Sequence, residues 1–258
     1  MARLIRRLGR RVGRMVEELG RLAEFTGHIV TVTMRPPLRI REFVDEVFKT
    51  GVLSILIIGI SGMAVGMVLG LQGYTTLVRF GAENSLGAVV GLSLIREMGP
   101  VLTALLTTGR AGSAITAEIG AMKATEQLDG LRMMAVDPVD YVIRPKAWAM
   151  VVSMPLLSAL FIVTGIAGGY VVGVDLMGID SGTFLSSLEN AVDFRDDVAG
   201  SIIKSVIFGT LVGLISTYRG YTAAPTSAGV SAATTSTVVI GSVSVLIFDY
   251  FITALWGV

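Results

Sequence analysis

The sequence predicts an all-α integral membrane protein, in which an N-terminal amphipathic segment precedes five membrane-spanning helices. Three observations support this fold class. The chain of 258 residues is 52% hydrophobic, and its mean hydropathy of +0.73 is too high for an ordinary soluble domain. Five apolar stretches reach the roughly 20 residues that cross a bilayer. Of the 21 Lys and Arg residues, 11 lie in residues 1–49, an asymmetry that sets the orientation of membrane proteins.

Residues 1–49 form the first expected unit, an amphipathic segment lying in the membrane interface. Apolar residues recur at helical spacing from Leu4 to Leu22, and six arginines in the first 14 residues fall largely between them. Such a helix is attracted by anionic lipid headgroups, and the arginines argue against a cleavable signal peptide. A nucleic-acid-binding arm is the alternative, but the apolar stripe continues towards a membrane span. Pro36 and Pro37 are expected to end the helix.

Residues 50–258 form the second unit, which contains the five spans. We expect spans at residues 50–73, 85–109, 147–174, 198–218 and 232–257. The basic N-terminus should stay in the cytoplasm, which places the C-terminus in the periplasm. The segment 110–146 then faces the cytoplasm. The segment 175–197, which has one arginine and no lysine, faces the periplasm and should hold a short helix around 181–190, with Ser181 as its N-cap.

Glycines recur every four residues in three of the expected spans. Such ridges let helix backbones approach closely in lipid. Packing within one subunit is favoured over a dimer seam for each ridge. The ridges comprise Gly62, Gly66 and Gly70, then Gly165, Gly169 and Gly173, and finally Gly209 and Gly213.

Catalytic and metal-binding signatures are missing from the sequence. There is no GxxxxGK[ST] phosphate loop, no GxSxG elbow and no HExxH motif. The chain has no cysteine and one histidine, so a thiolate metal site is excluded and a histidine site is disfavoured. We therefore expect a chain that is not an enzyme, binds no metal or cofactor and does not hydrolyse ATP itself.

Two charges lie inside the last two spans. Lys204 lies about 9 Å from the outer end of the fourth span, and Asp249 lies about 12 Å from the outer end of the fifth, at 1.5 Å per helical residue. A lone charge in lipid costs several kcal/mol and therefore finds a partner. The matching depths predict that Lys204 and Asp249 face each other or share a polar cavity.

The second span contains Arg96 and Glu97 side by side, about 17 Å from its outer end. Adjacent helical residues diverge by about 100°, so at least one needs a partner on another helix or a polar ligand. Gly99 and Pro100 follow directly and should kink the span. Two readings remain open: a charge network that only locks the bundle, or one that lines a substrate cavity in the outer half.

The cytoplasmic segment 110–146 is too polar to cross lipid and too short to be a domain. Its centre, from Glu118 to Met134, has helical periodicity, and Pro138 and Pro145 bound it. A short amphipathic helix offered to the cytoplasm suits docking into a groove of a soluble partner. A solvated loop is the alternative.

Three stretches of the chain together resemble the MlaE/YrbE permease family. They are GVLSILIIGISGMAVGMVLGLQGY at 51–74, SLIREMGPVLTALLTTGRAGSAITAEIGAMKATEQLDGLRMMAVDP at 93–138 and GYTAAPTSAGVSAATTSTVV at 220–239. These motifs are long and specific, and the resemblance covers about residues 45–258.

The resemblance implies the membrane subunit of an ABC transporter that moves phospholipid between the inner and outer membranes of Gram-negative bacteria. Such permeases lie in the inner membrane as homodimers, with a lipid cavity at the dimer interface and a cytoplasmic coupling helix between the second and third spans. The implied partners are an MlaF-like ATPase that binds ATP and Mg, an MlaB-like STAS protein and a periplasmic MlaD-like MCE hexamer. No nucleic acid is expected among them.

The resemblance also assigns site residues. The coupling helix falls at about 121–133, and its expected ATPase contacts are Lys123, Thr125, Glu126, Gln127, Leu128 and Met133. The expected lipid-binding residues are Leu69, Tyr74, Leu77, Val78, Phe80, Arg96, Glu97 and Met98, with the fifth span closing the seam. Arg96 would meet a phosphate or brace the cavity.

Two other functions stay open. An ion-coupled secondary transporter would use Asp249 or Glu97 as a proton site and would work without an ATPase, which the expected coupling helix argues against. A scaffold without a substrate would only anchor the ATPase and the MCE ring.

Overall fold

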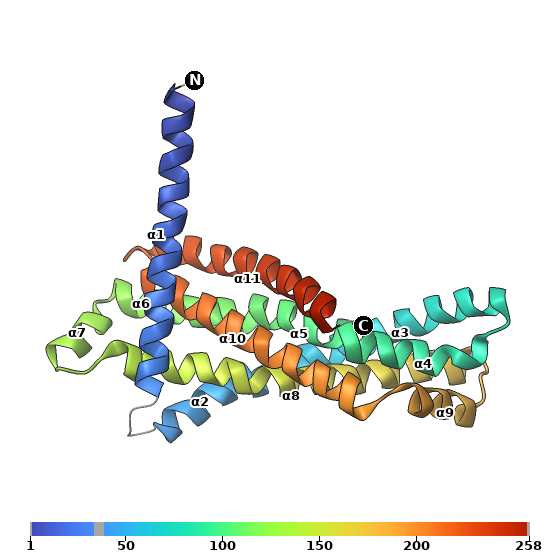
Figure 1. Cartoon of the computed structure of the whole chain (residues 1–258). Coiled ribbons are helices and arrows are strands. Elements are labelled where there is room, and N and C mark those ends of the chain that lie inside the picture. Colours follow the sequence, from blue (N-terminus) through green and yellow to red (C-terminus); the bar gives the residue numbers. More distant parts are fainter. Residues whose placement is uncertain (1, 34–38, 257–258) are drawn as a thin grey trace.

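The computed structural model describes residues 2–33 and 39–256, and the side chains of residues 17, 18, 20–33 and 39–255. The described residues form helices and short connections, as expected for the all-α class (Figure 1). The α-helices are α1 (Ala2–Thr33), α2 (Ile40–Thr50), α3 (Ile55–Leu77), α4 (Leu86–Ser93), α5 (Gly99–Thr107), α6 (Ser113–Ala124), α7 (Gln127–Met133), α8 (Arg144–Tyr170), α9 (Ser181–Ala191), α10 (Ala199–Thr222) and α11 (Ser227–Trp256).

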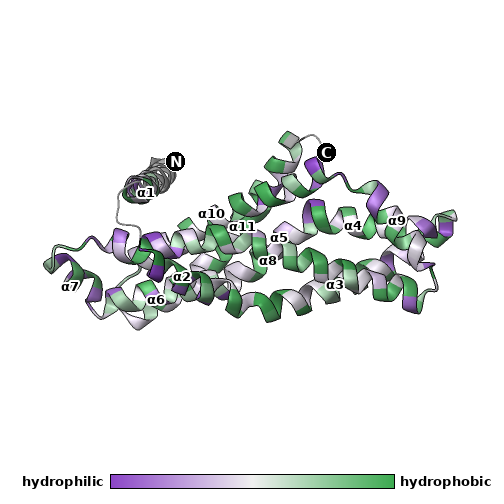
Figure 2. Cartoon of the chain, turned by 90° about the horizontal axis from the view of Figure 1, so that it is seen from below, coloured by the Kyte–Doolittle hydropathy of each residue, from purple (hydrophilic) through white to green (hydrophobic). Residues whose placement is uncertain are grey.

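Five helical stretches of the described chain are long and apolar enough to cross a membrane, which confirms the expected number. They are Ile40–Phe80, Glu83–Ala124, Val139–Leu176, Phe194–Thr222 and Ser227–Leu255. Figure 2 shows apolar residues along the middle of these helices and hydrophilic residues gathered towards the two ends of the bundle. The protein is therefore a multi-pass membrane protein.

The second span is longer than the sequence predicted. We expected it to end at residue 109, before Arg110, but the helix continues through a π-helical turn at Thr108–Gly112 into α6. The charge is tolerated there because Arg110 Nη1 donates to Lys49 O at 2.6 Å and to Ser54 Oγ at 2.9 Å. A paired arginine does not have to end a helix.

The glycine ridges pack within the subunit, as favoured from the sequence. Gly66 of α3 faces Gly165 of α8 so closely that an added Cβ would overlap the Gly165 carbonyl oxygen. Gly70 faces Gly169 in the same way, with 3.1 Å from an added Cβ to the carbonyl oxygen. Without a hydrophobic driving force between helices in lipid, such close backbone contact is what holds α3 on α8.

Helix α1 crosses the ends of the spans at a steep angle, and its first half projects away from the bundle (Figure 1). Its last turns pack on the bundle, where Phe25 is buried against the rings of Tyr218 and Tyr221 at 5.5 Å between centroids. His28 Nε2 also lies 3.0 Å from Asp137 Oδ2. The side chains of the predicted stripe from residue 4 to residue 16, and the two prolines at 36 and 37, lie outside the described part of the chain.

The two ends of the bundle are named the α7 end and the α9 end, after the short helix that each carries (Figure 1). The short helix expected around 181–190 is α9, although its N-cap is Asp180 rather than Ser181. The Asp180 carboxylate accepts a hydrogen bond from Thr183 N at 2.9 Å. An aspartate is as good an N-cap as a serine, and the backbone of Asp180 is extended, as a cap requires.

Helices α3, α4, α8 and α9 form an arm that reaches further towards the α9 end than α10 and α11 do (Figure 1). Arg96 lies ten positions after the first residue of α4, yet it contacts Asp197, which precedes α10. The start of α4 therefore lies about 15 Å beyond the start of α10. This stagger explains why counting from span ends placed Arg96 deeper than Lys204.

Candidate functional site

A cluster of charges joins the second, fourth and fifth spans at the foot of the arm. Lys204 of α10 lies at its centre, with its side chain 8% exposed. Its Nζ lies 2.9 Å from Glu97 Oε1 and 3.3 Å from Asp249 Oδ1, so the expected contact between Lys204 and Asp249 is present. The same ammonium group donates to the Arg96 carbonyl oxygen at 2.9 Å and to Thr253 Oγ1 at 2.8 Å. One ammonium group therefore holds three spans together.

Arg96 pairs with a different carboxylate. Its Nε donates to Asp197 Oδ1 at 2.6 Å, and the other oxygen of Asp197 accepts from Asp193 N at 2.8 Å. The Asp197 side chain is 3% exposed, whereas that of Arg96 is 38% exposed. Arg96 and Glu97 thus point to separate partners, as the 100° between neighbouring helical residues requires.

The backbone at these charges is a π-helical turn, Leu94–Met98, directly before Pro100. The amide of Gly99 donates to Leu94 O, five residues back. Proline cannot donate to the helix and its ring crowds the preceding turn, so the wider turn accommodates it. At the place where a kink was expected, the helix has a π-helical turn on the N-terminal side of Gly99 and Pro100.

The cluster encloses a small polar cavity of about 30 Å³, which is room for about one water molecule. Its lining comes from the second, fourth and fifth spans: Arg96, Glu97, Asp196, Asp197, Gly200, Ser201, Lys204, Ile252 and Thr253. This cavity, as it exists in a single chain, is thus too small for a lipid.

The structure divides the expected lipid-binding residues between this cluster and the arm. Leu69 and Leu77 line a separate groove of about 270 Å³ together with Gln72, Val89 and Val90. None of the described residues lines both spaces.

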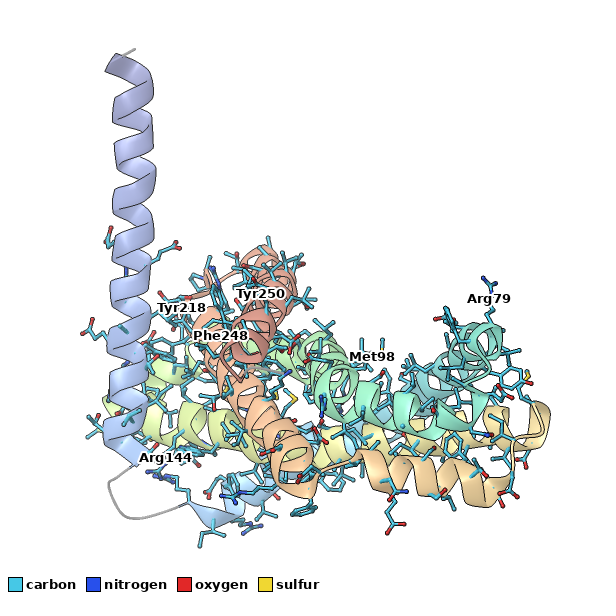
Figure 3. The ribbon with its side chains drawn as sticks, turned by 45° about the vertical axis from the view of Figure 1, so that its right-hand side comes forward. Arg79, Met98, Arg144, Tyr218, Phe248 and Tyr250 are labelled. Carbon is cyan, nitrogen blue, oxygen red and sulfur yellow. The ribbon has the colours of Figure 1, made fainter. Side chains whose placement is uncertain are left out.

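The other expected lipid-binding residues lie around the groove and the cluster. Tyr74 packs, partly buried, against the core of the arm. Val78 and Phe80 are exposed at the tip of the arm, and Phe80 is 79% exposed. Figure 3 shows Met98 between the tip of the arm, marked by Arg79, and the end of α11, marked by Phe248 and Tyr250. The described chain thus presents an open, largely apolar face above the charge cluster.

Asp197 and Thr253 are site residues that the sequence reasoning missed. Asp197 lies in the expected periplasmic segment 175–197, for which the sequence predicted no site residue. The spacing of Asp197 could have indicated its place in the site. It precedes Lys204 by seven positions, which is two helical turns, so both residues lie on one face of the helix. Thr253 follows Asp249 by four positions and donates to Glu97 Oε1 at 3.1 Å.

The expected coupling helix at 121–133 is not continuous. Helix α6 ends at Ala124, α7 begins at Gln127, and Glu126 between them has a left-handed backbone with φ of 60°. Apolar residues recur at helical spacing both before and after the break, so the periodicity did not reveal it. The segment is therefore two helices joined by a short turn rather than one amphipathic helix.

Two of the six expected ATPase contacts have partners within the subunit. Leu128 is 3% exposed and lies in the hydrophobic core. Lys123 Nζ donates to Tyr221 O at 2.8 Å, which satisfies a carbonyl in the last turn of α10. Thr125, Glu126, Gln127 and Met133 are exposed at the α7 end, and Met133 is 85% exposed. These four remain available to a partner.

Comparison with known proteins identifies the family of the chain. The family model described as Permease MlaE matches residues 43–255. The intermembrane phospholipid transport system permease protein MlaE of Haemophilus influenzae is 56% identical over 212 residues, which are 82% of this chain and 81% of that protein.

More distant relatives cover similar lengths of the chain. A probable ABC transporter permease protein of Rickettsia bellii is 38% identical over 96% of both chains. The chloroplastic protein TRIGALACTOSYLDIACYLGLYCEROL 1 of Arabidopsis thaliana is 31% identical over 88% of this chain and 65% of its own. With five spans in the structure and matches along most of its length, the chain belongs to the MlaE permease family.

Proposed function

We propose that this chain is the membrane permease subunit of an ABC transporter that moves phospholipid between the inner and outer membranes. The observation that carries the proposal is the 56% identity, over 82% of the chain, to the phospholipid transport permease of Haemophilus influenzae. The chain would lie in a bacterial inner membrane with the α7 end in the cytoplasm and the C-terminus in the periplasm. The excess of Lys and Arg in residues 1–49 supports this orientation, and the steep angle of α1 to the spans supports an interfacial position for it.

The working unit is a homodimer in this proposal, and α11 supplies its seam. Helix α11 has one face of small residues along a groove of about 630 Å³. Ala228, Ala232 and Ser236 on this face repeat every four residues, the pattern that lets two helices approach closely in lipid. Apolar side chains continue the face towards the α9 end, and Val243, Ile247 and Tyr250 among them are at least half exposed. A second copy would cover a surface that a single chain leaves to lipid.

The lipid cavity would form where two copies face each other above the charge clusters. Each chain alone has only about 30 Å³ of polar space beside Arg96 and Glu97. The open face around Met98 and the arm groove would supply apolar walls for acyl chains. Arg96 is already paired with Asp197, and Glu97 with Lys204, so Arg96 and Glu97 would chiefly brace the cavity. The side chain of Arg96 is 38% exposed, which leaves it able to contact a phosphate.

The energy would come from a separate ATPase that binds ATP and Mg and docks at the α7 end. Exposed Thr125, Glu126, Gln127 and Met133 form the expected contact. A STAS protein would support the ATPase, and a hexameric MCE protein would lie on the periplasmic side, at the α9 end. The chain itself would perform no hydrolysis.

The test is purification of the chain with its co-encoded partners, followed by reconstitution in vesicles. We expect bound phospholipid in the extract and ATP-dependent transfer of a fluorescent phospholipid. Transfer that needs no ATPase would support an ion-coupled carrier. No bound phospholipid, together with ATPase activity that added lipid does not change, would support a scaffold.

The seam has its own test. Ala232→Leu places a large side chain in the α11 groove and should lower the dimer fraction in cross-linking and mass measurements. Ala64→Leu makes the same change at an exposed position of α3 and should leave the dimer intact. Equal dimer fractions in both variants would remove α11 from the seam.

A further inference from the structure

A pocket of about 320 Å³ lies at the α7 end, where α1, α2 and α8 meet. This volume is at the small end of the roughly 300–1,000 Å³ typical of ligand pockets. Its walls are mostly apolar and include Ile40, Phe43, Pro145 and Trp148. Figure 3 shows Arg144 at this place, beside the end of α1 and above α2. The neighbouring Lys146 contacts Glu118, which lies 21 positions from Glu97, or about 30 Å along the second span. The pocket is therefore remote from the charge cluster.

Among the described residues that line this pocket, two are arginines, Arg39 and Arg144, and none is a carboxylate. Arg144 is part of its frame, because Nη1 donates to Val32 O at 2.9 Å and lies 2.8 Å from Asp140 Oδ1. The bond to Val32 ties the end of α1 to the start of α8, and Asp140 lies in the turn directly before α8.

Arg39 is held much less tightly than Arg144. Its nearest described carboxylates are Asp140 at 3.8 Å and Glu42 at 3.9 Å, and its guanidinium lies 4.4 Å from the ring centre of Tyr141. The distances to the two carboxylates exceed those of hydrogen bonds. Arg39 Nε is also buried without a hydrogen-bond partner among the described residues. Arg39 therefore keeps donor groups for a ligand.

The pocket adjoins an exposed apolar stripe on α2, since Ile40 belongs to both. Ile40, Val44 and Phe48 repeat every four residues along α2, and each is more than half exposed. These residues form the first part of the apolar stretch Ile40–Phe80. Trp148 is 41% exposed and has its indole N–H on Thr33 Oγ1 at 2.9 Å, an arrangement typical of aromatic residues at a membrane surface. A lipid in the leaflet at the α7 end could enter the pocket sideways.

We propose that this pocket binds one anionic phospholipid of that leaflet. Its phosphate would accept hydrogen bonds from Arg39, and part of one acyl chain would lie against Phe43, Pro145 and Trp148. The planar guanidinium matches a phosphate in geometry and charge, and apolar walls without a carboxylate suit a chain attached to an anion. The bound lipid would join α1 and α2 to α8. This site is separate from the proposed transport cavity and does not depend on it.

Trp148 provides a local probe, since the chain has only one other tryptophan, Trp256. The full-length Trp256→Phe protein is reconstituted in phosphatidylcholine vesicles that contain an increasing fraction of brominated phosphatidylglycerol, which quenches tryptophan fluorescence on contact. Brominated phosphatidylcholine at the same fractions measures contact with bulk lipid. We expect phosphatidylglycerol to quench Trp148 at lower fractions, with a relative binding constant about fivefold higher.

Arg39→Gln should remove this preference, and Arg39→Lys should keep part of it because the charge remains. Arg41→Gln is the matched control, since Arg41 lies two positions after Arg39, is exposed in the first turn of α2 and is not among the residues that line the pocket. Circular dichroism and gel filtration verify that each variant is folded. Addition of inorganic phosphate should leave the quenching unchanged, whereas competition by phosphate would show an anion site rather than a lipid site. Equal quenching by the two brominated lipids, or equal losses in the Arg39 and Arg41 variants, would overturn the proposal.

Discussion

The Nζ atom of Lys204 lies 2.9 Å from Glu97 Oε1, so the fourth span is joined to the second by a charge pair inside the membrane-spanning bundle. The sequence predicted a different pairing, Lys204 with Asp249, and that contact also exists at 3.3 Å. Three charged groups therefore form one unit, and the effect of changing one depends on the other two.

Lys204→Met should lower the free energy of unfolding by about 3 kcal/mol, because it leaves two carboxylates without their cation. Unfolding in mixed micelles measures this loss. Addition of Glu97→Gln and Asp249→Asn should restore part of it. A triple variant no more stable than Lys204→Met would show that the pairing is not the cause.

Exchange of Lys204 and Asp249 should fail to restore stability, although a simple pair would tolerate it. The exchange places a carboxylate at position 204 and removes from there the ammonium group that contacts Glu97 Oε1. Two negative charges then lie in this part of the cluster and repel each other. The exchange combined with Glu97→Gln should be more stable than the exchange alone, and the same unfolding assay compares them.

Gly66→Ala should prevent α3 from packing on α8. An added Cβ would overlap the Gly165 backbone, which cannot move aside as a side chain can. We expect a loss of about 3 kcal/mol and low yields of folded protein. Gly59→Ala is the matched control on the same helix, since its nearest atom would be Thr164 Cγ2 at 3.9 Å. Comparable losses in both variants would refute the close-packing argument.

Glu126→Gly distinguishes two contributions of Glu126 to the α6–α7 turn: the effect of its backbone conformation on stability, and the effect of its side chain on ATPase binding. Glycine adopts the left-handed backbone of Glu126 without the penalty of about 1 kcal/mol that other residues bear. The variant should therefore be more stable while binding the partner ATPase less well. Thermal unfolding and co-purification measure the two effects. Unchanged co-purification for both Glu126→Gly and Glu126→Lys would exclude this side chain from the docking surface.

Lys146→Met should destabilise the α7 end, where Lys146 contacts Glu46 at 2.9 Å and Glu118 at 2.7 Å. The Lys146 side chain is 4% exposed, so its removal leaves the negative charge of nearly buried Glu46 with less positive charge beside it. We expect the free energy of unfolding to fall by about 3 kcal/mol. Lys49→Met is the control: Lys49 contacts the same two carboxylates but is 52% exposed, which limits its effect to about 1 kcal/mol. Hydrogen exchange in α2 would report where the structure loosens.

Much of the fold could be predicted because lipid constrains it strongly. Every backbone polar group in a bilayer must be satisfied internally, so long apolar stretches can only be helices here. The number of spans followed from this rule, and the glycine ridges indicated close helix contacts. The break at Glu126 could not be predicted, since no glycine or proline marks it and the left-handed backbone is held by the packing of α6 and α7.

The sequence by itself determined the fold class, the five spans, the family and the residues that had to be paired within the membrane. The tertiary structure decided which partners they have: Arg96 with Asp197, Lys204 with both Glu97 and Asp249, and Lys123 with the end of α10. The physical reason is that hydropathy and helical periodicity are properties of one segment. Pairing depends on how far one helix is staggered along another, and the close packing of whole helices sets that stagger.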